Sequence, residues 1–264
     1  MERIDRPEAL ARLAQGQLRR GVFTNHFLAP ADVPGEIARG LRAEPFDGGL
    51  WILRRRGGHD LLTFYLQPGA SPPPPALERP TVTEVPWRPR DEAAAAAALD
   101  CRAVLGFREQ FRRRRRERPA DTPPEAPGVR AAGPEALTAA ADFLARHFDP
   151  LTGCLPDEAA LADALAAGQV LVTEDGAGLT GLLHFTAGRG AAELRHLAVR
   201  ADARGRGLGR QLVGGFLART AGLRRQVWAR AGNAAAEHLY ETNGFRPDGW
   251  RSAVLLAGER TDNP

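Results

Sequence analysis

Lysine is absent from this chain of 264 residues, so all 36 basic side chains are arginines. A Walker A loop needs the sequence G-K-[ST], in which the lysine contacts nucleotide phosphates, and is therefore excluded. Cysteine is scarce, and the two cysteines, Cys101 and Cys154, lie in different halves of the chain. They predict a reduced compartment without a disulfide framework, and no spacing of cysteine and histidine indicates a metal site.

Long apolar runs are missing too. No stretch approaches the roughly 20 apolar residues that are needed to cross a bilayer. The N-terminal sequence MERIDRPEAL carries charges of both signs and has no apolar core, so we predict no signal peptide. A G-x-S-x-G nucleophile elbow is also absent. These absences predict a cytoplasmic protein that does not bind a membrane.

The chain has no excess of negative charge, because its net charge is +4. Five consecutive arginines, Arg112–Arg116, can account for most of the positive excess. Such a run can bind nucleic acid, and the binding would then weaken with salt. No aromatic residue interleaves with these arginines, however, and Glu109 and Glu117 flank them. We predict a solvated face or an exposed terminal strand here, with nucleic-acid binding as the alternative.

The most informative stretch is Glu193–Phe216, ELRHLAVRADARGRGLGRQLVGGF. Its pattern predicts a strand, a glycine-rich turn at Arg204–Gly209 and an amphipathic helix. Glycines allow the backbone to approach a ligand, and the free amides and dipole at the start of a helix attract anions. Arg204, Arg206 and Arg210 add positive charge. The turn therefore predicts a phosphate or pyrophosphate site, although its spacing does not fit a dinucleotide-binding Rossmann turn.

A second block, Gln226–Phe245, has the sequence QVWARAGNAAAEHLYETNGF and predicts a strand followed by a helix at Ala234–Thr242. The two blocks together resemble the GNAT superfamily (Gcn5-related N-acetyltransferases). The first block resembles its acyl-CoA-binding motif, and the second resembles its N-x-x-A-x-x-x-Y-x-x-x-G-F signature. The residues that match this signature are Asn233, Ala236, Tyr240, Gly244 and Phe245. The resemblance covers about half of the chain, from near residue 130 to the C-terminus.

The resemblance implies an α/β (α+β) fold with a mixed, mostly antiparallel sheet flanked by helices. It also implies acyl transfer, with acetyl-CoA or another acyl-CoA as donor. The acyl-CoA site would comprise Leu197, Ala198, Val199, Arg204, Gly205, Arg206, Gly207, Leu208, Gly209, Arg210, Asn233 and Tyr240. Independently of any ligand, Asn233 is predicted to cap the helix that follows it.

An amine with a pKa near 10 must lose a proton before it attacks a thioester, so the reaction needs a base, an oxyanion donor and an acid. Family resemblance assigns the base to Glu193, directly or through water. It assigns the oxyanion donor to the Val199 N–H and the acid to Tyr240. The alternatives are a surface carboxylate at a strand start for Glu193 and a core tyrosine for Tyr240.

His196 competes with Glu193 for the role of base. Strand alternation places Glu193, Arg195, Leu197 and Val199 on one side, and His196 on the other unless a bulge shifts the register. A structural role is therefore expected for His196. For His184 the pattern leaves open whether it faces the sheet interior or the acceptor cleft.

The expected organisation is two tandem domains, residues 1–118 and 129–264, joined by a linker at 119–128 that contains four prolines. In the first domain we predict a helix at Glu8–Arg20, strands at Gly49–Arg54, Asp60–Leu66 and Thr81–Trp87, a helix at Asp91–Leu105 and a last strand. This order is that of a GNAT domain without its acyl-CoA motif. The first domain is thus a degenerate GNAT-like copy without acyl-CoA or, alternatively, an unrelated α/β capping domain.

The second domain is expected to begin with helices at Pro134–His147 and Pro156–Ala167, which in the family line the acceptor site, and to end with a closing strand at Arg251–Leu256. The predicted function is acyl-CoA-dependent N-acylation of a primary amine on a small molecule or peptide by direct attack on the thioester. The alternative is a non-catalytic module that binds acyl-CoA or an acyl carrier protein. The chain is expected to be a monomer or a homodimer.

Overall fold

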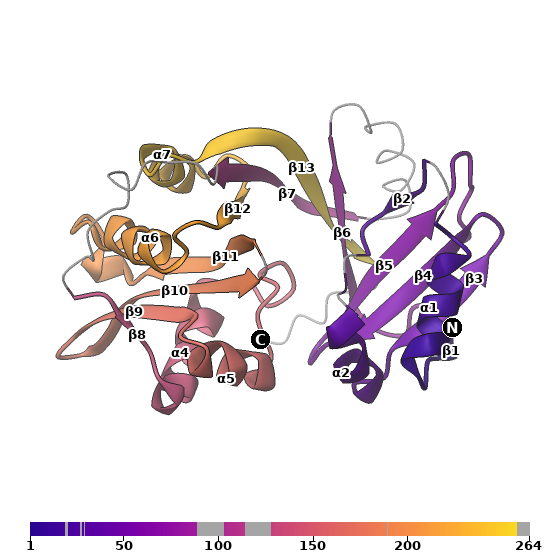
Figure 1. Cartoon of the computed structure of the whole chain (residues 1–264), viewed down its shortest axis with the longest axis horizontal. Coiled ribbons are helices and arrows are strands. Elements are labelled where there is room, and N and C mark those ends of the chain that lie inside the picture. Colours follow the sequence, from indigo (N-terminus) through magenta and orange to yellow (C-terminus); the bar gives the residue numbers. More distant parts are fainter. Residues whose placement is uncertain are drawn as a thin grey trace. The chain divides into compact units, whose positions relative to one another are not determined.

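A computed structural model describes residues 1–18, 21–26, 28, 30–88, 103–113, 128–188 and 190–257 (Figure 1). The chain divides into two compact units. Unit 1 contains Met1–Phe107 and Trp250–Pro264, and unit 2 contains Arg108–Gly249. The predicted linker lies outside the described residues except for Gly128. Two units are therefore present, but their limits differ from the expected domain limits, because unit 1 includes the C-terminal segment from Trp250 and unit 2 begins at Arg108, before the predicted linker.

Unit 1 begins with a short strand, two helices and a second short strand. These are β1 (Glu2–Arg3), α1 (Pro7–Gln15), β2 (Phe23–Thr24) and α2 (Val33–Ala38), which follows the single turn η1 (Pro30–Asp32). The strands β3 (Arg42–Phe46), β4 (Gly49–Arg55), β5 (Asp60–Leu66) and β6 (Thr81–Trp87) then form the sheet. Neighbouring strands are antiparallel except β5 and β6, which are parallel.

Unit 2 also begins with a short strand and two helices. The short strand β8 (Arg130–Ala131), the turn η4 (Pro134–Ala136) and the helices α4 (Leu137–His147) and α5 (Glu158–Ala166) come first. The strands β9 (Val170–Asp175), β10 (Gly178–Gly188), β11 (Ala191–Val199) and β12 (Arg224–Arg230) follow, with η5 (Ala201–Ala203) and α6 (Leu208–Arg219) between the last two. The helix α7 (Ala234–Thr242) comes after β12. Only β11 and β12 pair in parallel among these strands.

The last strand of each unit comes from the other half of the sequence. β7 (Ala103–Arg113) pairs antiparallel with β12 of unit 2 from Arg108 to Arg113. β13 (Arg246–Ala257) pairs antiparallel with β6 of unit 1 through Arg251–Ala257. The predicted closing strand therefore exists, but it completes the sheet of unit 1. Alternating apolar residues identify a strand without identifying the edge to which it adds.

β7 also bears on two other expectations. Ala103–Leu105 are the start of this strand rather than the end of the expected helix, whose residues 91–102 lie outside the described part of the chain. In the arginine run, Arg112 and Arg113 are strand residues paired with Gln226 and Arg225, whereas residues 114–116 are not described. Nucleic-acid binding by this run stays an untested alternative.

Helices cover both faces of the unit 2 sheet (Figure 1). On one face α6 buries Leu212, Val213 and Phe216 against Leu183 and Leu194. On the other face α4 and α5 pack through Phe143, Leu144 and Leu161 against Val170, Val172 and Leu182. The result is a mixed α/β fold with a mostly antiparallel sheet flanked by helices, as the sequence predicts. Within the described residues, no helix is long and apolar enough to cross a bilayer.

The Glu36 carboxylate of unit 1 is buried among arginines. The Glu36 side chain of α2 is 3% exposed and accepts hydrogen bonds from Arg39, Arg54 and Arg56 at 2.9–3.1 Å. Burial alone would raise the pKa of Glu36, but the hydrogen bonds from Arg56 and Arg54 outweigh it and lower the pKa to about 2. The stabilisation from this cluster is therefore present above pH 4.5 and is lost as the pH falls toward 2.

Candidate functional site

The β11 strand contains a bulge in the middle of the predicted site. His184 of β10 pairs with His196, whereas Phe185 pairs with Leu194, so Arg195 has no partner on β10. Leu194 belongs to the core on the α6 face, and Leu197 and Val199 pack against the same core. Residues on one face of a regular strand are separated by an even number, but Leu194 and Leu197 are three apart. An extra, bulged residue between them accounts for this odd separation. The bulge therefore puts His196 on the same face as Glu193, and the prediction that they face opposite sides is wrong.

β11 leaves its parallel neighbour just before the bulge. The last pair between β11 and β12 is Leu194 with Val227. On the other side, the Arg200 N–H donates to the Thr180 carbonyl over 2.8 Å. Because hydrogen-bonded residues alternate along an antiparallel pair, the N–H groups of Leu197 and Val199 point away from β10, toward the edge that β12 has left. This open edge offers main-chain donors to a ligand.

A glycine turn with left-handed residues leads from β11 into α6. Gly205 and Gly207 have φ angles of 77° and 78°, which favour glycine, and Gly207 is the N-cap of α6. Successive backbone amides in such a turn, together with the first amides of the helix, form a concave site for anions. Arg204, Arg206 and Arg210 are exposed around it. The turn predicted to bind a pyrophosphate thus has the backbone conformation of an anion-binding turn.

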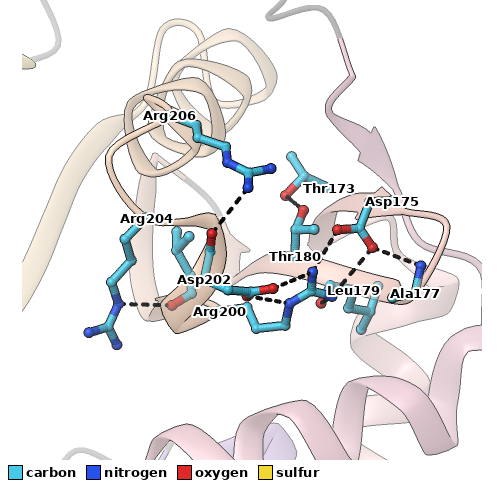
Figure 2. A network of polar contacts seen from close by, with 10 residues as sticks. Thr173, Asp175, Ala177, Leu179, Thr180, Arg200, Asp202, Arg204 and Arg206 are labelled. Atoms are coloured by element: carbon cyan, nitrogen blue, oxygen red, sulfur yellow. Dashed lines mark hydrogen bonds and ion pairs between the residues drawn. The ribbon is translucent and has the colours of Figure 1, made fainter.

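An ion-pair network holds this turn in place (Figure 2). The Arg200 guanidinium bridges Asp175, at the end of β9, and Asp202 in η5, each at 2.6 Å. Hydrogen bonds from Arg200 lower the pKa of both carboxyls. Arg204 Nε donates to the Val199 carbonyl over 3.2 Å, and Arg206 donates to the Asp202 carbonyl over 3.2 Å. The sequence does not reveal this network, because Asp175 and Arg200 lie on different elements and meet only in the folded chain.

Tyr240 lies on the α6 face of the sheet. It is 5% exposed and packs beside Phe245 and Phe111, with ring centroids at 6.0 and 6.2 Å. Burial raises the pKa of the Tyr240 phenol, which keeps its O–H protonated at neutral pH. Phe111 comes from β7, so the sequence analysis did not connect it with this site. Asn233 caps α7 as predicted, because its Oδ1 accepts from the Ala236 N–H over 3.2 Å.

Glu193 is held by two neighbours. One carboxylate oxygen accepts from the Arg195 guanidinium over 2.6 Å and the other from the Gln226 amide over 2.7 Å. Its side chain is 20% exposed. Glu193 is thus neither a free surface carboxylate nor an unpartnered buried base. It lies on the opposite face of the sheet from Tyr240.

His184 and His196 form a buried pair on the same face as Glu193. Their rings are close to parallel, at 7°, and the two Nδ1 atoms lie 3.1 Å apart. His196 Nε2 lies 2.8 Å from the Gly153 carbonyl, which can only accept, so Nε2 carries the proton. With both rings neutral, His184 Nδ1 donates to His196 Nδ1, and His184 Nε2 keeps a lone pair. Burial, with a smaller effect from Arg195, lowers the pKa of His184 to about 4.

The turn that contacts His196 follows α4. Gly153 packs so tightly that an added Cβ would lie 2.6 Å from the Asp149 carbonyl, and Cys154 has a φ angle of 50°. Phe148, at the end of α4, meets the His196 ring edge to face at 5.0 Å. This turn therefore fixes the orientation of the histidine pair. His184, whose direction the sequence left open, faces the side covered by α4 and α5.

The structure brings most of the predicted residues to one place. Gly209 lies where α6 meets α7 and β11, since an added Cβ would be 3.4 Å from Leu239 and 3.9 Å from Val199. The backbone donors and the glycine turn meet at the end of β11. Tyr240 lies on one face and Glu193, with the histidine pair, on the other. Side chains from both faces of the sheet thus lie near this edge.

Comparison with known proteins bears on the family of residues 166–247 and on the fold. A family model described as an acetyltransferase (GNAT) domain matches residues 166–247. No curated protein matches the chain by sequence. A solved acetyltransferase from the GNAT family from Colwellia psychrerythraea is similar with a TM-score of 0.59 and 17% identity, over 97% of this chain and 99% of that chain. A GCN5-related N-acetyltransferase from Sphaerobacter thermophilus gives 0.57 and 14% identity, over 97% and 95%.

A third solved structure is relevant to the two units. It is a tandem GNAT protein from the clavulanic acid biosynthesis pathway, with a TM-score of 0.59 and 15% identity, and it covers 96% of this chain and 94% of that chain. At such low identity these likenesses concern the fold alone, but they extend over both units. The matched domain, residues 166–247, includes the bulge, the glycine turn and α7. Residues 166–247 thus match a GNAT acetyltransferase domain in sequence, and the likeness in fold to GNAT structures extends over both units.

Proposed function

We propose that this chain transfers an acetyl group from acetyl-CoA to a primary amine. The observation that carries the proposal is the open edge of β11, which ends at a preformed anion site. The main-chain donors of Leu197 and Val199 face this edge, and the amides of Gly205–Gly209 face the place of a pyrophosphate. A ligand with a peptide-like chain between a thioester and a pyrophosphate fits both features, and acyl-CoA has this chemistry.

The residues divide the reaction between the two faces of the sheet. The amine attacks the thioester carbonyl, the carbon–nitrogen bond forms and the carbon–sulfur bond breaks. The Val199 N–H stabilises the oxyanion, and the Tyr240 phenol gives its proton to the departing thiolate. The proton released by the amine passes to the opposite face, where Glu193 and the histidine pair lie. The acceptor would enter from the side of α4 and α5.

The proposal is tested by thiol release from acetyl-CoA in the presence of a panel of primary amines. Replacing Tyr240 by phenylalanine removes the acid and leaves the ring packing, so we expect unchanged acetyl-CoA affinity and a rate reduced by about 100-fold. Tyr65, the other tyrosine of the chain, lies in the unit 1 core, and Tyr65→Phe is the matched control. Acetyl-CoA binding without thiol release for any amine would favour the non-catalytic binding module instead.

The base is assigned by comparing Glu193→Gln with His184→Asn. Because both oxygens of Glu193 are engaged while His184 is neutral at pH 7 with a lone pair on Nε2, we expect the larger loss of rate in His184→Asn. We expect at least a tenfold difference between the two variants near neutral pH, within the usual range for general base catalysis of ~100- to 10,000-fold. His147→Asn, which alters a histidine turned toward the Phe143 carbonyl, is the control. A larger loss in Glu193→Gln would restore the sequence-based assignment.

Several features of the proposal stay predictions. The acyl chain length and the acceptor, a small molecule or a peptide amine, depend on the α4 and α5 side of the site. A cytoplasmic location and a monomer or homodimer are likewise predicted. Size-exclusion chromatography with light scattering would distinguish the two assembly states.

A further inference from the structure

Unit 1 contains a counterpart of the open edge in unit 2. β5 and β6 pair in parallel at two positions only, Asp60 with Thr81 and Leu61 with Val82. Beyond these pairs the two strands separate, as β11 and β12 do beyond Leu194. The separation leaves main-chain groups of β5 without a partner on β6. In unit 1, however, another segment of the chain fills the gap.

The segment that enters the gap is β2. Phe23 pairs with Leu66 and Thr24 with Tyr65, both antiparallel. The Thr24 hydroxyl also donates to the Phe64 carbonyl over 2.5 Å. Val22 packs against the core formed with α1 and α2, whereas Phe23 packs against the core on the other face, 5.6 Å from the Phe64 ring. Successive side chains thus point to opposite faces, as in an inserted strand.

Asn25 joins the two separated strands through its side chain. Its Nδ2 donates to the Glu84 carbonyl of β6 over 2.7 Å and to the Leu62 carbonyl of β5 over 3.3 Å. Its Oδ1 accepts from the Phe64 N–H over 2.7 Å. Asn25 is 8% exposed, so a single buried amide uses both its N–H groups and its oxygen to bridge the gap.

His26, the last residue of the segment, contacts β5 through its side chain. Its Nδ1 lies 2.9 Å from the Thr63 hydroxyl, and its main-chain N–H donates to the Thr24 hydroxyl over 3.0 Å. Burial, with a smaller effect from the charge of Arg54, lowers the pKa of His26 to about 4. The ring is therefore neutral at pH 7 and offers no positive charge to an anionic ligand.

The connection between β5 and β6 differs from its counterpart in unit 2. Residues 67–80 include the sequence SPPPP and form no helix, whereas β11 and β12 are joined through the glycine turn and α6. This connection has one left-handed glycine, Gly69, but no helix N-terminus follows it, so it offers no anion site like that at Gly205–Gly209.

We propose that residues Phe23–His26 are a built-in occupant of the unit 1 gap, in the place where unit 2 leaves room for an acyl-CoA. The occupant adds as a strand, in the manner of β-augmentation but within one chain. Unit 1 is consequently a closed copy, and the protein binds one acyl-CoA per chain, in unit 2. This last step rests on the proposed function, whereas the occupancy of the gap does not.

Hydrogen exchange of the Phe64 amide tests the occupancy. This amide should exchange slowly in the full chain, and at the same rate with and without saturating acetyl-CoA. Asn25→Ala removes its acceptor and should accelerate its exchange by about tenfold or more. Asn243→Ala, which removes an amide from unit 2, should leave Phe64 unchanged. Fast exchange of Phe64 in the wild type, or acceleration by acetyl-CoA, would overturn the proposal.

Calorimetric titration with acetyl-CoA tests the consequence. We expect a stoichiometry of one, and no residual binding in Gly207→Glu, because that variant alters the unit 2 site alone. Two equivalents in the wild type, one of which remains in Gly207→Glu, would show that unit 1 is open. If the wild type binds no acyl-CoA, the proposed function fails, and the exchange rate of Phe64 still decides whether the gap is filled.

Discussion

Replacing Gly207 by glutamate is expected to weaken acetyl-CoA binding by at least about 100-fold while leaving the protein folded. Gly207 has a φ of 78° and is the N-cap of α6, where the first amides of the helix are free. A Cβ at this position meets no other atom within 4 Å, so the side chain itself is accommodated. The left-handed backbone costs about 1–2 kcal/mol for a residue other than glycine. The added carboxylate places negative charge where the phosphates would lie.

A matched control lies at the other end of the same helix. Gly222 also has a φ of 78°, and a Cβ there meets no other atom within 4 Å. Gly222→Glu should therefore cost the same stability and leave acetyl-CoA binding unchanged. Gly207→Gln adds a side chain of the same size without the charge, and should therefore lose less acetyl-CoA affinity than Gly207→Glu. Calorimetry measures all three, and wild-type affinity in Gly207→Glu would place the phosphate site away from α6.

Residues 124–264 expressed alone are expected to bind no acetyl-CoA, although they contain every residue of the predicted site. This fragment lacks β7, which pairs with β12 over Arg108–Arg113. It also lacks Phe111, which is 2% exposed in the core that contains Tyr240. Removing a buried phenylalanine costs about 3–5 kcal/mol, a large part of the 5–15 kcal/mol that stabilises a typical domain. Acetyl-CoA titration and circular dichroism of the purified fragment measure the effect.

The complementary experiment expresses residues 1–123 and 124–264 together as two chains. The first piece supplies β7 to unit 2 and the second supplies β13 to unit 1, so the pieces should co-purify and bind acetyl-CoA.

In the full chain, Leu255→Ala should accelerate amide exchange in unit 1, because Leu255 is fully buried beside Trp51 and Phe64. If the fragment 124–264 alone folds and binds like the full chain, β7 is dispensable and the sequence-based domain limits are correct.

Local patterns predicted most elements of the fold. β5, β6 and α7 have the predicted bounds, and β4, β11 and β12 differ only at their ends. These elements have clear two-residue or 3.6-residue periods, or glycine turns at their ends. The short strands β1, β2, β3 and β8 and the helix α2 were not predicted. They have too few residues for a period, and they form because the neighbouring sheet and core are already there.

The candidate site was predicted in part for the same reason. The glycine turn and the strand end at Leu197–Val199 are local signals that lie at the end of β11, and Asn233 is a local signal that caps α7. Arg200 with Asp175, and Tyr240 with Phe111, are contacts between distant segments. The bulge at Arg195 reverses the expected relation of Glu193 and His196, and only the pairing of β11 with β10 reveals it.

By itself the sequence determined the chemistry that is available: an anion-binding turn, a phenol, a carboxylate and a pair of histidines on successive strands of one α/β domain. The tertiary structure decided which strand completes each unit, which face each of these groups occupies, and that β2 fills the gap in unit 1. The physical reason is that side-chain periodicity is a property of the local sequence, whereas main-chain N–H and C=O groups are the same in almost every residue. Which edge a strand pairs with therefore depends on the competition among all edges in the folded protein.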